Sequence, residues 1–83
     1  MKTQFLVLPY KLGARNKVEA QQAQACRTGD EARRTGERMA KRFHGGVVMS
    51  QDYDETADFA ADPVVLATHG TVPDQWDEFK AAA

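Results

Sequence analysis

Residues 28–49 read TGDEARRTGERMAKRFHGGVVM, and this stretch contains the start of a helix, its end and the strand that follows. Its first four residues match a capping box, in which the Thr28 hydroxyl caps the first turn and Glu31 reaches back. His44-Gly45-Gly46 is typical of a helix end, because glycine adopts the backbone conformations that stop a helix. Val47-Val48-Met49 is then a short β-rich run. The stretch predicts one helix after Thr28 and a strand directly after it.

The predicted helix has two chemically different sides. At about 100° per residue, small and apolar residues fall on one side: Ala32, Gly36, Met39, Ala40 and Phe43. Basic residues fall on the other side: Arg34, Arg38 and Lys41. Because small side chains allow a close approach, we expect the first side to lie against a sheet, with Met39 and Phe43 as its anchors.

Two further apolar runs predict strands. Phe5-Leu6-Val7-Leu8 is closed by Pro9, and Val64-Val65-Leu66-Ala67 follows Pro63. Neither run alternates between apolar and polar residues, and the same holds for residues 47–49. Such runs are typical of strands that are buried on both faces. We therefore expect a sheet that is covered on both sides.

Residues 17–27 allow two interpretations. They contain good helix formers, so one long helix could start near Arg15. However, Gly29 would cost about 1 kcal/mol inside such a helix, and the cap at Thr28 would have no function there. The turn-like segment 13–16 instead favours a second strand that pairs with the first. We expect a small two-layer α+β domain of order β-β-α-β-β, with one amphipathic helix packed on one face of the sheet. The alternative is β-α-β-β with one long helix.

Short motifs are spread over most of the chain: Val7-Leu8-Pro9-Tyr10-Lys11, Cys26-Arg27, Glu31-Ala32-Arg33-Arg34, Pro63-Val64-Val65-Leu66-Ala67, and Gly70 with Val72-Pro73. In these motifs the chain resembles a group of short uncharacterised bacterial proteins. In that group, the segment that matches residues 17–25 looks extended. The resemblance implies a ββαββ-like fold and no particular activity, since none is attached to the group.

One domain accounts for residues 1–72, and residues 73–83 form a C-terminal tail. A chain this short buries only about 60–65% of its unfolded surface, so its core is small. In the tail, one helical turn capped by Asp74 would place Trp76 and Phe79 side by side. These two aromatic residues either fold back over the sheet or serve as a docking peptide for a partner.

Charge is divided along the chain. Residues 1–45 carry ten basic and four acidic side chains, a net charge of +6, whereas residues 46–83 carry one basic and eight acidic side chains, a net charge of −7. Such a dipolar molecule can pair with itself or present one charged face to a partner. Residues 52–62 predict a solvated, mobile acidic loop between the last two strands. Its candidate interaction residues are Asp52, Asp54, Glu55 and Asp58.

The single cysteine, Cys26, cannot form a disulfide within one chain and fits a reducing, cytoplasmic setting. The apolar run at residues 5–8 is too short for a secretory signal, which needs about 7–15 apolar residues. No stretch reaches the roughly 18 apolar residues of a membrane span. We therefore expect a cytoplasmic protein, and we interpret the closing Ala81-Ala82-Ala83 as a cloning remnant.

Residues that could bind a metal or catalyse a reaction lack the necessary spacing. The soft ligands are Cys26, His44 and His69, whereas a structural zinc site usually has four. The acidic segment starts like a calcium loop, but Ala57 and Pro63 stand where Gly and Glu are required. A nucleophilic Cys26 would need a histidine beside it, and free cysteine more often behaves as a small buried residue. We expect no metal, no cofactor and no enzymatic activity.

Four basic residues form a candidate interaction stripe, the basic stripe: Arg34, Arg38, Lys41 and Arg42. Such a stripe can lie along the phosphates of a nucleic acid. It can also be a solvated face that is joined by the ion pairs Asp30–Arg34 and Glu37–Lys41, both in the favourable acid-first order. An acidic loop and tail in the same small domain would repel nucleic acid, which favours the second interpretation.

A single helix covers only one face of a four-stranded sheet, so the apolar residues of the other face need another cover. A second copy of the chain is the simplest cover, with basic helices meeting acidic loops across a two-fold axis. We therefore predict a non-enzymatic binding or regulatory module that acts as a homodimer through this sheet face. Two alternatives stay open. One is a nucleic-acid-binding accessory protein that uses the basic stripe, and the other is a small phage-related inhibitor that docks on a larger protein through its acidic loop.

Overall fold

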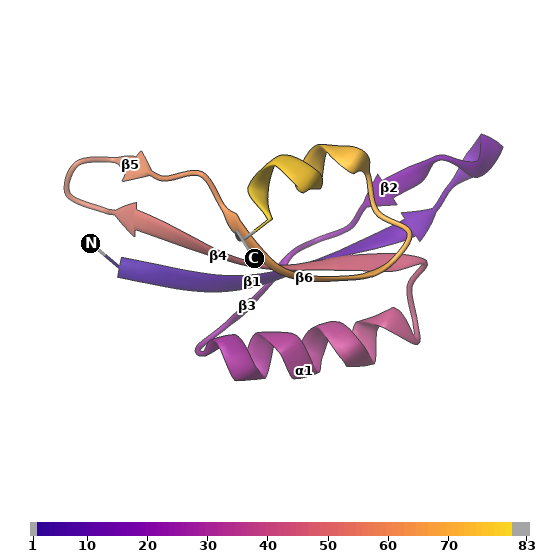
Figure 1. The fold of residues 1–83 in the computed structure, drawn as a ribbon, viewed down its shortest axis with the longest axis horizontal. Helices are drawn as coiled ribbons and strands as arrows, with labels where there is room; N and C mark the ends of the chain where they lie inside the picture. The colour runs from indigo at the N-terminus through magenta and orange to yellow at the C-terminus, as the bar shows by residue number, and fades with distance from the viewer. Residues whose placement is uncertain (1, 81–83) are drawn as a thin grey trace.

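An antiparallel sheet of six strands, one α-helix and two 3-10 helices make up residues 2–80, the part of the chain that the computed structural model describes (Figure 1). Along the chain these are β1 (Lys2–Leu12), η1 (Ala14–Asn16), β2 (Val18–Ala20), β3 (Gln24–Cys26), α1 (Gly29–Ala40), β4 (Gly45–Asp54), β5 (Phe59–Ala60), β6 (Val64–Gly70) and η2 (Asp74–Phe79). The predicted α+β class and the packing of one helix on the sheet are confirmed. Ala81–Ala83 lie outside the described residues.

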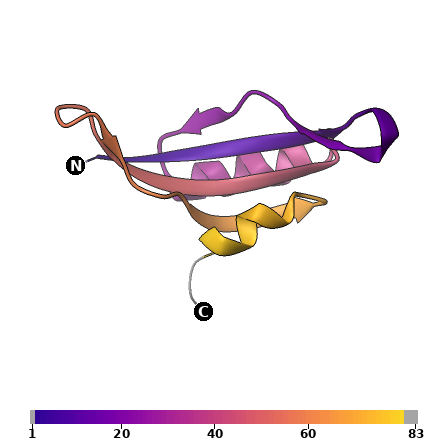
Figure 2. The ribbon, with the colours of Figure 1, turned by 90° about the horizontal axis from the view of Figure 1, so that it is seen from above.

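Strands β1 and β4 form the centre of the sheet and pair from Lys2–Tyr53 to Tyr10–Gly45. β2 and β3 pair with the other edge of β1, whereas β5 and β6 pair with the other edge of β4, and all these pairs are antiparallel. β3 and β4 therefore run parallel to each other on either side of β1, and α1 connects them across one face. A hairpin protrudes at each end of the molecule, β1–β2 at one end and β4–β5 at the other (Figures 1 and 2).

Strand β1 continues through Pro9 to Leu12, so the predicted strand end at Pro9 is wrong. The Pro9 carbonyl accepts a hydrogen bond from Gln21 N at 2.8 Å. The backbone nitrogen of Pro9, which carries no hydrogen, faces the same edge, because N and C=O of one strand residue point the same way. The neighbouring strand is interrupted here, since β2 ends at Ala20 and β3 begins at Gln24. Pro9 thus lies within a continuous strand, and the interruption falls in the neighbouring strand, between β2 and β3.

Residues 17–27 contain the predicted second strand, in two short pieces, and the long-helix alternative is wrong. η1 makes the turn that leads from β1 into β2. Arg15 and Asn16 in this turn both have a φ of 60°, in the left-handed region. Gly13 N donates to Lys17 O at 2.7 Å and closes the turn.

Helix α1 begins at the predicted cap and ends earlier than predicted. Glu31 N donates to Thr28 Oγ1 at 3.1 Å, and Glu31 Oε2 accepts from the backbone N–H of the residue before the cap at 3.2 Å. The helix ends at Ala40, ahead of the predicted stop at residues 44–46. His44 N then donates to Tyr10 O at 2.9 Å, which aligns the start of β4 with β1.

The side of α1 that contacts the sheet is the predicted one, with Met39 as an anchor, but Phe43 lies beyond the end of the helix and belongs to neither core cluster, so its predicted role as an anchor is wrong. Ala32 and Gly36 are buried, and Ala32 forms a core cluster with Val7 and Val48, against which Met39 packs. A methyl group on Gly36 would lie 2.5 Å from Val48 Cγ2. Glycine at this position therefore allows the close approach of helix and sheet.

Successive residues of the central strands alternate between the two faces of the sheet. The core under α1 consists of Val7, Ala32 and Val48, with Phe5, Cys26, Met39, Leu66 and Ala67 packed around it. The core under η2 consists of Tyr10, Val47, Met49 and Val65, with Leu6, Leu8, Val18, Val72, Trp76 and Phe79 packed around it. The sheet is thus covered on both sides, as the lack of polar alternation predicted.

The cover of the second face is the tail of the chain itself, so the expectation that this face needs a second copy as its cover is wrong. Trp76 and Phe79 pack against the sheet, with ring centroids 6.1 Å apart in an edge-to-face arrangement. Trp76 Nε1 donates to the hydroxyl of Tyr10 at 2.7 Å. Val65 of β6 also forms a parallel bridge with Lys80. Of the two interpretations of the tail, the structure has the fold-back arrangement.

The acidic segment 52–62 is not the irregular loop that its composition predicted. β4 extends to Asp54, and the chain returns as β5 in a hairpin. Ala61 N donates to Asp52 O at 2.9 Å, next to the paired strands. Asp58 at the turn has a φ of 50°. The segment is therefore a hydrogen-bonded hairpin with an exposed tip.

Candidate functional site

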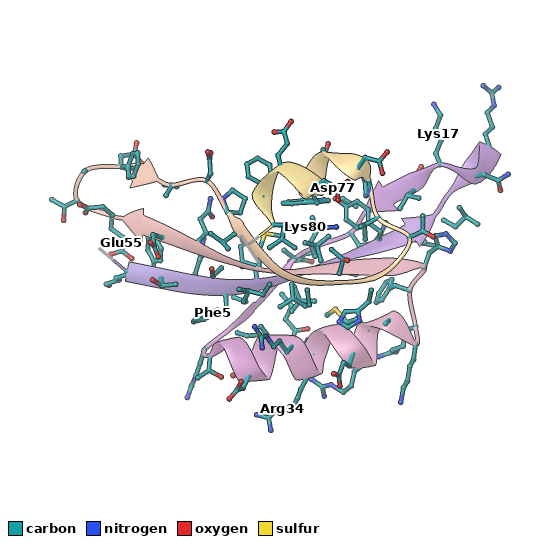
Figure 3. All side chains as sticks on the ribbon, viewed as in Figure 1. Phe5, Lys17, Arg34, Glu55, Asp77 and Lys80 are labelled. Carbon is teal, nitrogen blue, oxygen red and sulfur yellow. The ribbon has the colours of Figure 1, made fainter. Side chains whose placement is uncertain are left out.

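The basic stripe lies on the side of α1 that faces away from the sheet. Arg34 and Arg38 belong to the helix, Lys41 and Arg42 follow directly after its last residue, and all four are exposed. Figure 3 shows Arg34 pointing away from the sheet, on the side opposite to Asp77 of η2. The helix therefore brings the four predicted basic residues to one surface of the domain.

The expected ion pairs along this stripe are not formed. Within residues 2–80, the ion pairs are Lys2–Glu55 at 3.6 Å and Lys80–Asp77 at 2.9 Å. The two predicted pairs, Asp30–Arg34 and Glu37–Lys41, are therefore wrong. No carboxylate of the described chain neutralises the stripe by direct contact.

A buried threonine holds one of the guanidinium groups. Arg38 Nη2 donates to Thr35 Oγ1 at 3.2 Å, and Thr35 is only 2% exposed. The thiol of Cys26, at the end of β3, approaches the same hydroxyl at 3.8 Å. The bond to a buried acceptor restricts the Arg38 side chain, so less conformational entropy is lost when Arg38 binds a ligand. Sequence reasoning missed Thr35, although the signal was a hydroxyl on the small-residue side between Ala32 and Gly36.

Two shallow hollows lie beside the basic stripe, and Arg38 and Lys41 line both of them. The first, of about 480 Å³, lies between α1 and β3 and is lined by Gln24, Thr35, Arg38, Met39, Lys41 and Arg42. The second, of about 520 Å³, lies along α1 and is lined by Glu31, Arg34, Glu37, Arg38 and Lys41. The four basic residues together with these two hollows are called the basic groove below.

A third hollow adjoins the first at the point where Pro9 interrupts the sheet edge. It has a volume of about 450 Å³ and is lined by Pro9, Gln21, Gln22, Ala23, Gln24, Met39 and Phe43. Gln24 and Met39 line both this hollow and the first one. One of its walls is the segment that joins β2 to β3. We call it the edge hollow.

The acidic residues of the second half of the chain lie away from the basic groove, whereas Glu31 and Glu37 of α1 line its second hollow. Figure 3 shows Glu55 in the β4–β5 hairpin at one end of the molecule and Lys17 near the β1–β2 hairpin at the other. Asp74, Asp77 and Glu78 belong to η2, which lies on the opposite face of the sheet from α1 (Figure 1). The charge division along the sequence has thus become a division between faces and between ends.

Three of the four candidate acids in the hairpin have partners within the domain. Asp52 Oδ1 accepts from Thr3 Oγ1 at 2.6 Å. Asp54 Oδ1 caps the hairpin turn by accepting from the backbone N–H groups of residues 56 and 57, at 3.0 and 3.3 Å. Glu55 pairs with Lys2. These contacts give Asp52, Asp54 and Glu55 a structural role in the hairpin, whereas Asp58 lies at its exposed turn.

Groups for metal binding do not converge in the described residues. Across residues 2–80, no three His, Cys, Asp or Glu side chains are close enough to hold a metal ion. The Cys26 thiol contacts Thr35, and His69 Nε2 is buried near Gly36 without a hydrogen-bond partner. No helix between residues 2 and 80 is both long and apolar enough to cross a bilayer.

Comparisons with known proteins add no relative. No protein-family model matches the chain, and no curated protein or solved structure is significantly similar to it.

Proposed function

We propose that this domain is a non-enzymatic binding module whose basic groove binds the phosphate backbone of a nucleic acid. The observation that carries the proposal is the convergence of four cationic side chains around two hollows that share Arg38 and Lys41. Guanidinium groups present a fork of donors that matches phosphate oxygens, and an ammonium group adds a point charge. From Arg34 to Lys41 the groove extends about 10 Å along the helix axis. Four cationic side chains spread over this length can contact three or four phosphates.

Two features of the fold support a phosphate ligand over a merely solvated face. The helix carboxylates do not pair with the basic stripe, so little of its charge is cancelled by contact. The acids of η2 lie behind the sheet, and those of the β4–β5 hairpin lie at one end of the molecule. In about 0.1 M salt, exposed charges more than about 10 Å apart are largely screened from each other. The repulsion of nucleic acid by the acids of η2 and of the hairpin is therefore weak at the groove, where Glu31 and Glu37 are the acids that oppose the four basic residues.

Salt titration of binding tests the proposal. We expect the domain to bind a labelled oligonucleotide in fluorescence anisotropy, with an affinity that falls as salt rises because bound phosphates release counterions. Three or four phosphate contacts predict a slope of log K against log salt of about −2 to −3.5. A fourfold rise in salt should then weaken binding by about 15- to 130-fold. Absence of binding at low salt, or binding that salt does not change, would contradict the proposal.

Self-association is a second candidate, favoured by the opposite charge of the two ends of the molecule. Leu12 in β1 is 43% exposed at the basic end, and Phe59 in β5 is 52% exposed at the acidic end. Because the tail already covers the sheet face, the two copies of such a homodimer contact each other through these ends. The attraction between the opposite charges of the ends then holds the dimer together. We therefore expect light scattering to show a dimer in low salt that dissociates in about 0.5 M salt. A monomer at every salt concentration would remove this candidate.

Two sequence-based expectations accompany the proposal. A cytoplasmic location is supported by the single free thiol of Cys26, which fits a reducing compartment. Docking of the acidic β4–β5 hairpin on a larger protein is supported by the exposure of Phe59 beside acidic side chains. Both are predictions, and the proposed function does not depend on either of them.

A further inference from the structure

We infer that the nucleic acid is single-stranded, with its phosphates on the basic groove and unstacked bases in the edge hollow. The inference rests on the proposed function and names its substrate class. Its starting point is that the two sites share Gln24 and Met39 as lining residues. A ligand that follows α1 can therefore occupy both sites at once.

The edge hollow has the chemistry of a base-binding surface. Pro9, Met39 and the aromatic ring of Phe43 supply its apolar part, and Met39 and Phe43 are only half-buried. Bases stack on aromatic side chains with little dependence on sequence, because every base has a π-face. The hollow therefore offers a stacking surface directly beside the cationic side chains.

The polar part of the edge hollow consists of glutamine amides. Gln22 and Gln24 are exposed, and within residues 2–80 their side-chain amides form no hydrogen bond, whereas the Gln21 amide donates to Glu19 O at 3.2 Å. A free carboxamide has both donors and an acceptor and can pair with the edge of a base. The amides of the edge hollow can bind the polar edge of a base, and the cations of the basic groove can bind phosphate. The two sites together therefore suit a ligand that carries both a base and a phosphate.

The shape of the surface favours a single strand over a duplex. In a duplex the bases are stacked inside, and the protein must insert an element into a groove to reach their edges. Here the apolar and amide groups line a recess, so the bases must leave their stack and enter the recess. Unpaired bases of a single strand can do so, because they can be splayed away from the backbone.

Fluorescence anisotropy with a labelled oligothymidine and a labelled duplex of the same length tests the inference at one salt concentration. Electrostatics alone favours the duplex, which carries more phosphates per length. We expect the opposite order, with the single strand bound about tenfold more tightly. Phe43→Leu, which keeps the apolar bulk and removes the ring, should weaken single-strand binding by about fivefold. Gln24→Ala should weaken it as well, and Gln75→Ala on η2 should not.

The outcomes separate this inference from the proposed function. A duplex bound as tightly as the single strand, with no effect of Phe43→Leu or Gln24→Ala, would overturn the inference and leave the phosphate-binding groove in place. No binding of either oligonucleotide would overturn both. Gln24 is exposed, so Gln24→Ala keeps the test decisive if Phe43→Leu lowers the stability of the domain.

Discussion

Trp76→Ala should lower the free energy of unfolding by about 2–4 kcal/mol. Truncation of a buried tryptophan costs about 3–5 kcal/mol, and Trp76 is half-buried, so the loss of apolar contact is smaller here. The substitution also removes the donor that satisfies the Tyr10 hydroxyl, in a residue that is only 3% exposed. Urea denaturation followed by circular dichroism measures the change.

Two further variants separate the contributions of Trp76. Trp76→Phe keeps an aromatic ring on the sheet and removes the N–H donor, so we expect a loss of about 1 kcal/mol. Gln75→Ala changes an exposed neighbour in the same 3-10 helix and should stay within about 0.5 kcal/mol of the unchanged protein. Trp76 is the single tryptophan of the chain, so its fluorescence reports on this site alone. Emission like that of an unfolded chain, with stability unchanged in Trp76→Ala, would show that η2 does not cover the sheet.

The elements with a strong local signal could be predicted from the sequence. The capping box at Thr28 and Glu31 is local chemistry, and it sets the start of α1. The small residues Ala32 and Gly36 recur at helical spacing, so they identify the side that meets the sheet. Apolar runs without polar alternation likewise predicted a sheet with two covered faces. In each case neighbours in sequence are sufficient to determine the conformation.

The features that depend on contacts between distant residues could not be predicted in this way. Pro9 was expected to end its strand, but its effect falls on the neighbouring strand through the missing N–H. The tail was expected either to dock on a partner or to fold back, and the choice depends on Tyr10, 66 residues away from Trp76. The extension of β4 to Asp54 depends on pairing with the start of β1.

The candidate site was predicted in part. The basic stripe follows from helical spacing, so its four residues were found from the sequence. The edge hollow was not found, because it requires the interruption between β2 and β3 and brings Pro9 and Phe43 to the lining of one hollow. Thr35 was missed because its hydroxyl matters only through the approach of Arg38 and Cys26. The roles of such residues depend on tertiary contacts, which local sequence patterns do not indicate.

Arg34→Glu with Arg38→Glu should weaken oligonucleotide binding by at least about 100-fold at moderate salt. Hydrogen bonds to charged groups contribute about 1.5–3 kcal/mol each, and both substitutions replace attraction by repulsion. Loss of two phosphate contacts should also reduce the salt slope by about 2. Both side chains are exposed and glutamate is a good helix former, so we expect the fold to persist. Circular dichroism checks this point.

The matched control is Arg15→Glu with Lys17→Glu in the β1–β2 hairpin. It changes the net charge of the protein by the same amount, and both residues are exposed, but neither lines the basic groove. At about 0.15 M salt, charges more than about 8 Å from a bound phosphate are largely screened. We therefore expect the affinity of this control to stay within about threefold of the unchanged protein.

The affinity ratio of these two double variants, measured by fluorescence anisotropy on the same oligothymidine, tests the central claim most directly. We predict that the variant of the basic groove binds at least about 30-fold more weakly than the variant of the hairpin. Equal affinities of the two double variants would contradict the claim, because binding would then depend on net charge and not on the groove along α1.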